Sequence, residues 1–250
     1  MRKAGTTRRA RPTRTRWKRT KSRSSRAWAF AARTGAEHTA VTTEIDTDPW
    51  LARWLPLLRE CAGDAPVLEL GCAAGRDTAT LVEAGLRVTA VELSSDAVAQ
   101  ARQRVPTGAT FHCGDFREAW PLADGATVGV VLASLSLHYF AWDETLALVR
   151  RIHRVLRPGG VLLCRLNSVN DLHHGARGPS ASGRDEDVFY TVDGIPKRFF
   201  DRTAVERLFA DGWTLQHLEE VRVLRYDAPK VAWEAVLRPA PFTPSSAAGS

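Results

Sequence analysis

One acidic residue and three small ones stand in a spacing that suits the binding of a ligand against the backbone. Glu69, Gly71, Ala73 and Gly75 form the pattern acidic-x-Gly-x-small-x-Gly at the end of an apolar run. Small residues let a ligand approach a turn closely, because no Cβ blocks the approach. A helical pattern begins just after Gly75, and a helix start offers free N–H groups and a partial positive charge.

The spacing of these small residues argues against a dinucleotide. The fingerprint of nicotinamide and flavin cofactors is G-x-G-x-x-G. Counted from Gly71, its second and third glycines would fall on Ala73 and Arg76. Arginine cannot replace a glycine that permits close packing of helix on strand, so a different ligand is predicted. For this loop taken alone, a tight turn without any ligand is the alternative.

Three further side chains with useful chemistry follow predicted strands. Glu92 ends an apolar run, and a carboxylate there can accept hydrogen bonds from both hydroxyls of a ribose; a solvated strand end is the alternative. Asp115 follows a short third strand, where an Asx-type turn is the alternative role. His138 follows a fourth strand, where a base that removes a proton would be useful. Its alternative is a structural residue packed against the next helix.

A parallel sheet is needed to bring these residues together. The order strand, turn and helix repeats along the chain, which predicts an open α/β sheet. The expected strands cover residues 67–70, 86–92, 110–113, 128–134 and 161–166. The carboxyl ends of parallel strands meet at one edge of the sheet, and ligands bind there.

Together these features resemble the class I S-adenosylmethionine-dependent methyltransferases. The loop at Gly71, the acids Glu92 and Asp115, and the phrase RVLRPGGVLL at residues 154–163 occur in that family's order and spacing over residues 65–166. The resemblance implies a Rossmann-like, doubly wound α/β sheet of about seven strands, mostly parallel with an antiparallel last strand.

The resemblance also implies S-adenosyl-L-methionine as the cofactor. It assigns to the cofactor site Glu69, Gly71, Ala73, Gly75, Glu92, Leu93, Asp115, Phe116 and Ser134. In the family, an acid at the position of Asp115 accepts from the adenine amino group, and Phe116 would form an apolar wall beside the ring. The backbone around Ser134 would touch the cofactor. Ala73 stands where a middle glycine is usual, a small departure from the pattern.

The acceptor side of the site is expected just after the fourth strand. By resemblance, His138 and Tyr139 face the methyl acceptor, and either could remove a proton from it. The sequences GRDT at residues 75–78 and LHYF at residues 137–140 look like those of bacterial small-molecule methyltransferases. The predicted function is in-line methyl transfer to a small acceptor. A non-catalytic protein that keeps the cofactor pocket is an alternative from a different class.

Composition supports one domain of about 200 residues with tails. The chain has 250 residues, of which 44% are hydrophobic, enough for a core. Its four cysteines are scattered, which predicts free thiols in a reducing compartment and no zinc site. With no run of eighteen apolar residues and no signal-peptide pattern, we expect a cytoplasmic protein without a membrane span.

The net charge of +7 comes from the N-terminal arm. Residues 1–33 hold thirteen of the 35 Arg and Lys, and the first of the 28 acids is Glu37, so the remainder has a net charge of −6. We expect residues 1–40 and 239–250 to be disordered and residues 41–238 to form the methyltransferase domain. The arm could bind nucleic acid, target an organelle, bind acidic surfaces or be a nonessential extension. A nucleic-acid methyltransferase that uses this arm is therefore a second alternative.

Residues 167–200 are predicted to form a lid-like insert over the site, with a hairpin at its end. Its aromatic residues, with Arg184 and Lys197, are candidates for contacts to the acceptor. Asp171, His173 and His174 lie in no predicted strand or helix that would hold metal ligands at a fixed spacing, so no metal site is expected. A helix over residues 48–60, a helix capped by Asp201 and two final strands over residues 213–224 and 231–237 complete the expected fold.

Overall fold

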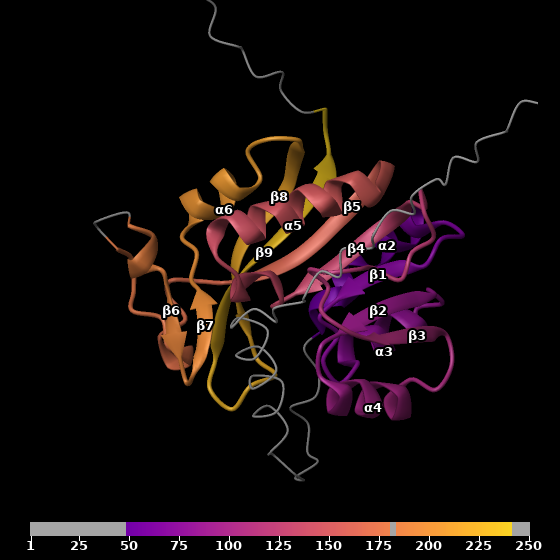
Figure 1. Cartoon of the computed structure of the whole chain (residues 1–250), viewed down its shortest axis with the longest axis horizontal. Helices are drawn as coiled ribbons and strands as arrows, with labels where there is room; N and C mark the ends of the chain where they lie inside the picture. The colour runs from indigo at the N-terminus through magenta and orange to yellow at the C-terminus, as the bar shows by residue number, and fades with distance from the viewer. Residues whose placement is uncertain (1–48, 181–183, 242–250) are drawn as a thin grey trace, which may run out of the picture.

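The computed structural model describes residues 49–180 and 184–241. Seven of its strands form one sheet in the order β3-β2-β1-β4-β5-β9-β8. Strands β1 to β5 are mutually parallel, and β9 is antiparallel to both of its neighbours. The predicted fold, a mostly parallel Rossmann-like sheet with one antiparallel strand, is confirmed. Figure 1 shows β3 at one end of the sheet and the β8–β9 hairpin at the other.

The elements alternate as the sequence predicts from the first strand onward. The sheet strands are β1 (Val67–Leu70), β2 (Val88–Glu92), β3 (Ala109–Cys113), β4 (Val128–Ser134), β5 (Leu156–Asn167), β8 (Trp213–Val223) and β9 (Lys230–Pro239). The α-helices are α2 (Leu55–Ala62), α3 (Arg76–Glu83), α4 (Ser95–Arg104), α5 (Trp142–Val155) and α6 (Arg202–Leu208). Short 3-10 helices are η1 (Pro49–Trp54), η2 (Leu137–Tyr139), η3 (Leu172–His174) and η4 (Asp185–Asp187).

Both faces of the sheet are buried, because side chains alternate along each strand and helices cover the two sides. In β4, Val131 and Ala133 belong to a core that also contains side chains of α5 and α6. Val130 and Leu132 belong to a second core, which contains side chains of α2, α3 and α4. The central strands are therefore apolar throughout, as a strand covered on both faces requires.

Three helix starts follow the expected capping chemistry to different degrees. Ser94 accepts a hydrogen bond from the N–H of Ala97 at 3.2 Å, and Asp201 accepts one from that of Ala204 at 2.7 Å. The cap at Asp201 confirms the predicted start of α6, and Ser94 caps α4 in the same way. The helix predicted over residues 48–60 is instead the 3-10 segment η1 followed by α2, with Pro56 in the first turn of α2. Proline suits that position because its missing N–H would have no partner there.

The sequence Arg157-Pro158-Gly159-Gly160, which precedes the expected fifth strand at residues 161–166, lies within β5. The pairing of β4 with β5 is shifted there: Val128 pairs with Leu156, and Val130 pairs with Val161. Gly159 has φ +78°, which a glycine adopts without strain, so the chain bends locally and then rejoins the ladder.

The predicted hairpin near residue 193 is present as a separate two-stranded ribbon, β6 (Phe189–Val192) and β7 (Ile195–Arg198). Figure 1 shows this ribbon beside the β8–β9 end of the sheet, far from β3 and α4. The expectations for residues 1–48, 181–183 and 242–250 lie outside the described residues. In the part that is described, no helix has the length and apolarity of a membrane span, and no group of three or more His, Cys, Asp or Glu is arranged to hold a metal.

Candidate functional site

The loop between β1 and α3 is shaped by three residues with positive φ: Gly71 at +80°, Ala73 at +47° and Gly75 at +78°. A Cβ on Gly71 would lie 2.6 Å from the Cβ of Ser136, so the loop approaches the segment after β4 very closely. Ala73 adopts a left-handed conformation that glycine would tolerate better, which matches its place in the motif. The predicted small-residue loop is therefore also the point where β1 and β4 converge.

Glu92 fixes this loop to the end of β2. Its carboxylate accepts the N–H of Ala73 at 3.0 Å on one oxygen and the N–H of Ser94 at 2.9 Å on the other. The side chain is 6% exposed, and burial raises its pKa above the ordinary value. A carboxylate has about four lone-pair positions, so Glu92 can still accept hydrogen bonds from a ligand.

Glu69 lies below the loop and is fully enclosed. Its carboxylate accepts a hydrogen bond from the Thr78 hydroxyl at 2.6 Å. Burial, with the nearby charge of Asp77, raises the pKa of Glu69 from 4.5 to about 8. Near neutral pH this carboxyl therefore holds a proton for much of the time, and it can donate as well as accept.

Glu69→Gln is expected to remove a pH dependence of stability. Between pH 4.5 and about 8 the folded protein holds a proton on Glu69 that the unfolded chain releases. The contribution of Glu69 to the free energy of unfolding is therefore full below pH 4.5 and is lost as the pH rises through about 8. Denaturant unfolding at several pH values should show a smaller fall for Glu69→Gln than for the wild type. Glu60→Gln, at an exposed position, is the control; equal slopes in the two variants would contradict the assignment.

Asp77 joins three elements that lie far apart in the sequence. Its Oδ1 accepts hydrogen bonds from the Trp50 indole and from Arg225, each at 3.1 Å. Its Oδ2 lies 3.9 Å from the guanidinium of Arg165, a side chain that is 0% exposed. The same guanidinium lies over the Trp50 ring, 3.9 Å from the ring centroid. Arg165 also donates to the Ser134 hydroxyl at 3.0 and 2.9 Å. Sequence reasoning missed this group, because single residues carry no signal of pairing over 148 positions.

The residues expected near an adenine ring have other contacts in the structure. Asp115 accepts the N–H of Arg117 at 2.9 Å and forms an ion pair with its guanidinium at 2.6 Å, the geometry of the alternative turn role. Phe116 is 0% exposed and stacks edge-to-face on Phe140 at 5.5 Å, so it packs in the core and offers no open wall. Its ring nevertheless lies near the loop, 3.8 Å from a Cβ built on Gly71. Leu93 packs against the same core.

The acceptor side is built on η2. His138 is 2% exposed, and its Nδ1 has no hydrogen-bond partner among the described residues. Its ring lies 4.3 Å from that of Tyr139, centroid to centroid. Burial lowers the pKa of His138 well below its ordinary value, and Lys230 and Lys197 lower it further. The imidazole is therefore neutral, and no carboxylate of the described residues bonds to its Nδ1 to assist it as a proton acceptor.

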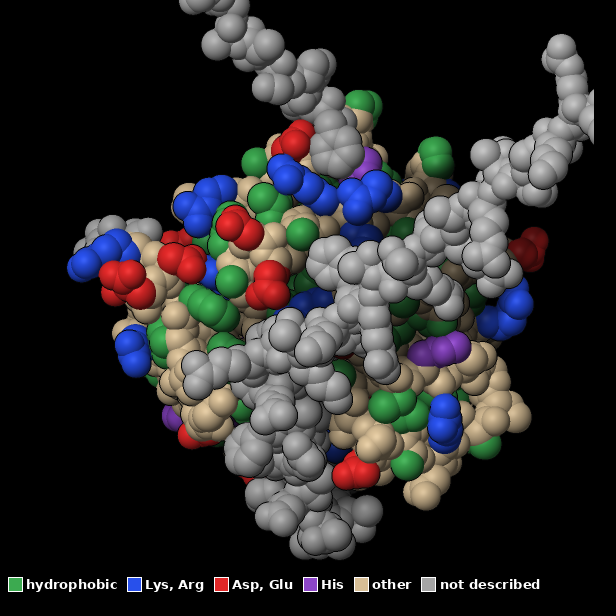
Figure 2. Space-filling model, in the orientation of Figure 1, with side chains coloured by type: hydrophobic (Ala, Val, Ile, Leu, Met, Phe, Trp, Pro, Cys, Tyr) green, Lys and Arg blue, Asp and Glu red, His purple; other side chains and the backbone are tan. Residues whose placement is uncertain are grey.

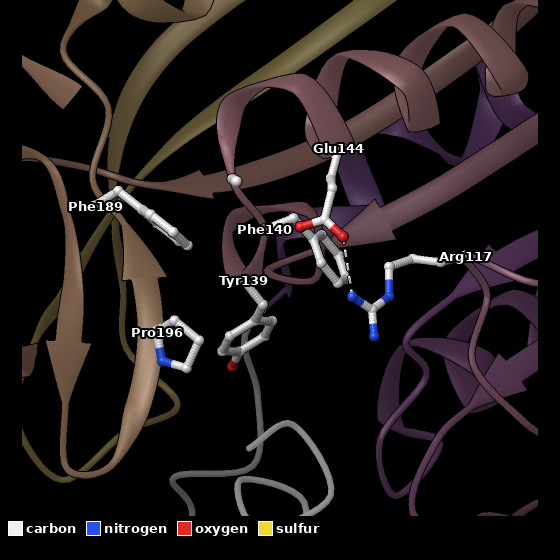
Figure 3. A pocket seen from close by; sticks show the side chains of 7 residues that line it. Arg117, Tyr139, Phe140, Glu144, Phe189 and Pro196 are labelled. Atoms are coloured by element: carbon white, nitrogen blue, oxygen red, sulfur yellow. Dashed lines mark hydrogen bonds and ion pairs between the residues drawn. The ribbon is translucent and has the colours of Figure 1, made fainter. Parts of the chain in front are cut away.

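A cavity of ≈ 200 Å³ lies next to Tyr139. It is lined by Arg117, Tyr139, Phe140, Ala141, Glu144, Phe189 and Pro196. Figure 3 shows Phe189 and Pro196, from the β6–β7 ribbon, across from Tyr139, with the Arg117–Glu144 ion pair of 3.2 Å on the other side. Burial raises the pKa of Tyr139, so its hydroxyl keeps its proton at neutral pH.

Comparison with known proteins agrees with this architecture. Residues 67–160, from β1 into β5, match the family described as "Methyltransferase domain". The chain carries a class I S-adenosylmethionine-dependent methyltransferase domain. Enzymes of this family take a methyl group from S-adenosylmethionine, which is their cofactor.

Three curated relatives illustrate the range of methyltransferases that are similar to this chain. The cypemycin N-terminal methyltransferase of Streptomyces sp is 33% identical over 123 residues, which are 48% of this chain and 49% of that one. The trans-aconitate 2-methyltransferase of Azoarcus sp. is 36% identical over 104 residues, which are 41% of this chain and 39% of that one. The tRNA N(3)-methylcytidine methyltransferase trm140 of Schizosaccharomyces pombe is 26% identical over 132 residues, which are 46% of this chain and 42% of that one. The chain spans about half the length of the curated relatives it matches first.

A solved structure shows the same fold over most of the chain. The methyltransferase from Anabaena variabilis superimposes with a TM-score of 0.61, covering 89% of this chain and 98% of that one at 15% identity. The similarity in fold therefore extends beyond the matched family region.

The methyltransferase domain fits its cofactor on the structure's own evidence. Gly71 leaves no room for a Cβ, and the buried hydroxyl of Ser136 beside it has no partner among the described residues. An unpaired buried hydroxyl is costly, so a ligand group that bonds to it would be favoured. With the spare lone pairs of Glu92, polar groups from β2 and from the segment after β4 converge on the loop.

Proposed function

We propose that this domain transfers the methyl group of S-adenosylmethionine to a small-molecule acceptor by in-line displacement. The observation that carries the proposal is the segment 134–139. Its Ser136 packs against the cofactor loop at Gly71, and its Tyr139 lines the adjacent cavity. One short segment thus separates the two places that a methyl donor and a methyl acceptor would occupy.

On the cofactor side, we assign binding roles to residues at the carboxyl ends of the strands. Glu92 would accept hydrogen bonds from the ribose hydroxyls, and Ser136 would bond to a polar group close to the loop. Arg165 and Arg225, gathered by Asp77, would favour an anionic group such as the carboxylate of the amino-acid part. Asp115 keeps only part of its acceptor capacity because Arg117 occupies both oxygens, so its contact to the adenine amino group is the weaker part of the assignment.

On the acceptor side, the domain's task is orientation and the exclusion of water. S-adenosylmethionine supplies, when bound, a methyl group activated by a positively charged sulfur. Holding a nucleophile in line with it can lower the barrier by roughly 7–11 kcal/mol. Tyr139, Phe140, Phe189 and Pro196 give the cavity apolar walls. His138 is neutral and can take a proton from an acceptor hydroxyl or amine, which adds about 10²–10⁴-fold in such reactions.

The size of the cavity supports a small acceptor. It measures ≈ 200 Å³, and the β6–β7 ribbon supplies two of its seven lining residues. We propose that residues 167–200 act as the cover of this site, because the ribbon packs on η2 and its Arg198 forms an ion pair with Asp185 of η4. A nucleotide within an RNA strand would need an open groove in place of a covered cavity.

A nucleic-acid acceptor is a second candidate, because a tRNA methyltransferase is among the relatives. It would depend on the basic residues 1–33, which lie outside the described residues. Figure 2 shows acidic and basic side chains over the same face of the described domain. A tRNA affinity that falls steeply with salt and vanishes on deletion of residues 1–33, together with methylated tRNA as product, would favour this candidate.

Glu92→Gln tests the proposal directly. Calorimetry should show an affinity for S-adenosylhomocysteine reduced by about 10- to 100-fold, since one or two hydrogen bonds to a charged acceptor are weakened. The control is Glu83→Gln, which changes the same charge at an exposed position on α3. If both variants and the wild type bind equally, the pocket assignment is wrong. If the wild type binds but methylates no acceptor, the domain is a non-catalytic binding protein.

A further inference from the structure

Two lysines from different elements lie near the buried imidazole of His138. Lys197 belongs to β7, whose ribbon packs against η2, and Lys230 is the first residue of β9. Each lies close enough to His138 to oppose its protonation. No carboxylate of the described residues has a comparable effect on the ring. The acceptor side of the domain therefore has a cationic corner, defined here as His138, Lys197 and Lys230.

Only one of these two lysines has a countercharge in contact among the described residues. Lys230 is 8% exposed, and its Nζ lies 2.7 Å from Oδ2 of Asp171. The other oxygen of Asp171 accepts the N–H of Val231 at 2.9 Å, so both oxygens of this carboxylate bind to the start of β9. A buried pair held in this way is compensated and does not call for a ligand.

The ammonium group of Lys197 has no ion pair or hydrogen bond with any described residue, although the residue is half-buried. Asp193 and Asp171 influence it at a distance, while burial and Lys230 lower its pKa. A half-buried ammonium without a contacting partner is costly. The cationic corner therefore retains one ammonium group, that of Lys197, which no acidic side chain of the described domain contacts.

The third member of the corner is a polar atom without a partner. His138 Nδ1 is buried and makes no hydrogen bond within the described domain. Buried polar atoms are nearly always bonded, so an orphan at a binding site indicates a ligand atom or water that completes it. It stands beside Tyr139, which lines the acceptor cavity.

We propose that the methyl acceptor carries a carboxylate, which Lys197 binds beside His138 in the cationic corner. This inference rests on the proposed function, because it names the class of acceptor for the same site. One uncompensated ammonium matches one monoanionic carboxylate. A phosphate dianion would bring twice the charge, and the corner has neither an arginine fork nor a helix N-terminus to hold it.

A bound carboxylate would also change the proton chemistry of the site. In the free protein the groups that face His138 are Lys197 of β7 and Lys230 of β9, with Tyr139 next to it on η2. Both lysines disfavour the imidazolium that proton removal would create. A carboxylate on Lys197 offsets the part of that field that comes from Lys197, so the acceptor itself would make His138 a better base. Acceptors without a negative charge would lack this effect.

The test uses the full chain, saturated with S-adenosylhomocysteine, and follows the ring signals of His138 by NMR. The signals are assigned by their loss in His138→Gln. The probes are benzoate, its neutral isostere benzamide, and phenyl phosphate. Benzoate should move the titration midpoint of His138 upward by about one pH unit. Benzamide should leave the midpoint unchanged, and phenyl phosphate should have the smaller effect.

Substitutions separate the role of Lys197 from a general effect of charge. Lys197→Met should abolish the response to benzoate, and Lys197→Arg should restore most of it. Arg202→Met, which removes an exposed cation on α6, should keep the response. Equal shifts with benzoate and benzamide, no shift with any probe, a larger shift with phenyl phosphate, or an unchanged response in Lys197→Met would each overturn the inference. Binding of S-adenosylhomocysteine, measured separately, shows whether the cofactor site itself stands.

Discussion

Replacing Gly129 with alanine is expected to destabilise the domain by about 4 kcal/mol or more, a large part of the stability of a small domain. Gly129 lies in β4, where a Cβ would overlap the carbonyl oxygen of Cys61 and stand 3.0 Å from the Cα of Ala62. Both contacts are with the backbone of α2, so no side-chain rotation can relieve them. The helix would have to move off the centre of the sheet.

The measurement is the free energy of unfolding from urea denaturation. Gly114→Ala is the matched control, because a Cβ there meets nothing within 4 Å and the residue has no positive φ. It should change stability by no more than about 0.5 kcal/mol. A loss of similar size in both variants would show that α2 does not pack on β4 as closely as described.

The parts of the fold that sequence predicts well are those with local signals. The apolar run 128–134 predicts a strand buried on both faces, and β4 has those bounds. Ser94 and Asp201 are caps whose chemistry acts within three residues, and both caps are present. The small-residue loop is likewise local, so the spacing of its glycines is enough to predict it.

What the sequence did not reveal depends on residues that meet only in three dimensions. The helix predicted over residues 48–60 begins as the 3-10 segment η1, and the indole of its Trp50 donates a hydrogen bond to Asp77, 27 positions away. Phe116 has the right type and position for a ring-binding wall, yet it faces the core. The lack of a contacting partner at Lys197 among the described residues could not be predicted, since it depends on which acids the ribbon meets.

These long-range contacts share one consequence for the site. η1, β5 and the turn before β9 meet at Asp77, at the start of α3. The β6–β7 ribbon meets η2 on the other side of the segment 134–139. The cofactor loop is thus local in sequence. The proposed acceptor cavity instead combines residues of the matched family region with Phe189 and Pro196, which lie beyond it.

Gly71→Ala is expected to reduce the affinity for S-adenosylhomocysteine by at least about 100-fold, because the loop and the segment after β4 would have to separate. A Cβ at this position would lie 2.6 Å from the Cβ of Ser136, and both atoms are fixed by backbone. The displacement would also pull Ala73 from Glu92, which holds the loop by a hydrogen bond of 3.0 Å. The affinity is measured by calorimetry.

Gly85→Ala separates this steric effect from backbone strain. Gly85 has φ +86°, close to the +80° of Gly71, but a Cβ there meets nothing within 4 Å. Both variants therefore carry the strain of an alanine at positive φ, about 1 kcal/mol of stability. Only Gly71→Ala adds the contact with Ser136, so only it should lose the ligand. If Gly85→Ala loses as much affinity, strain alone explains the effect; if neither does, the loop at Gly71 is not where the cofactor binds.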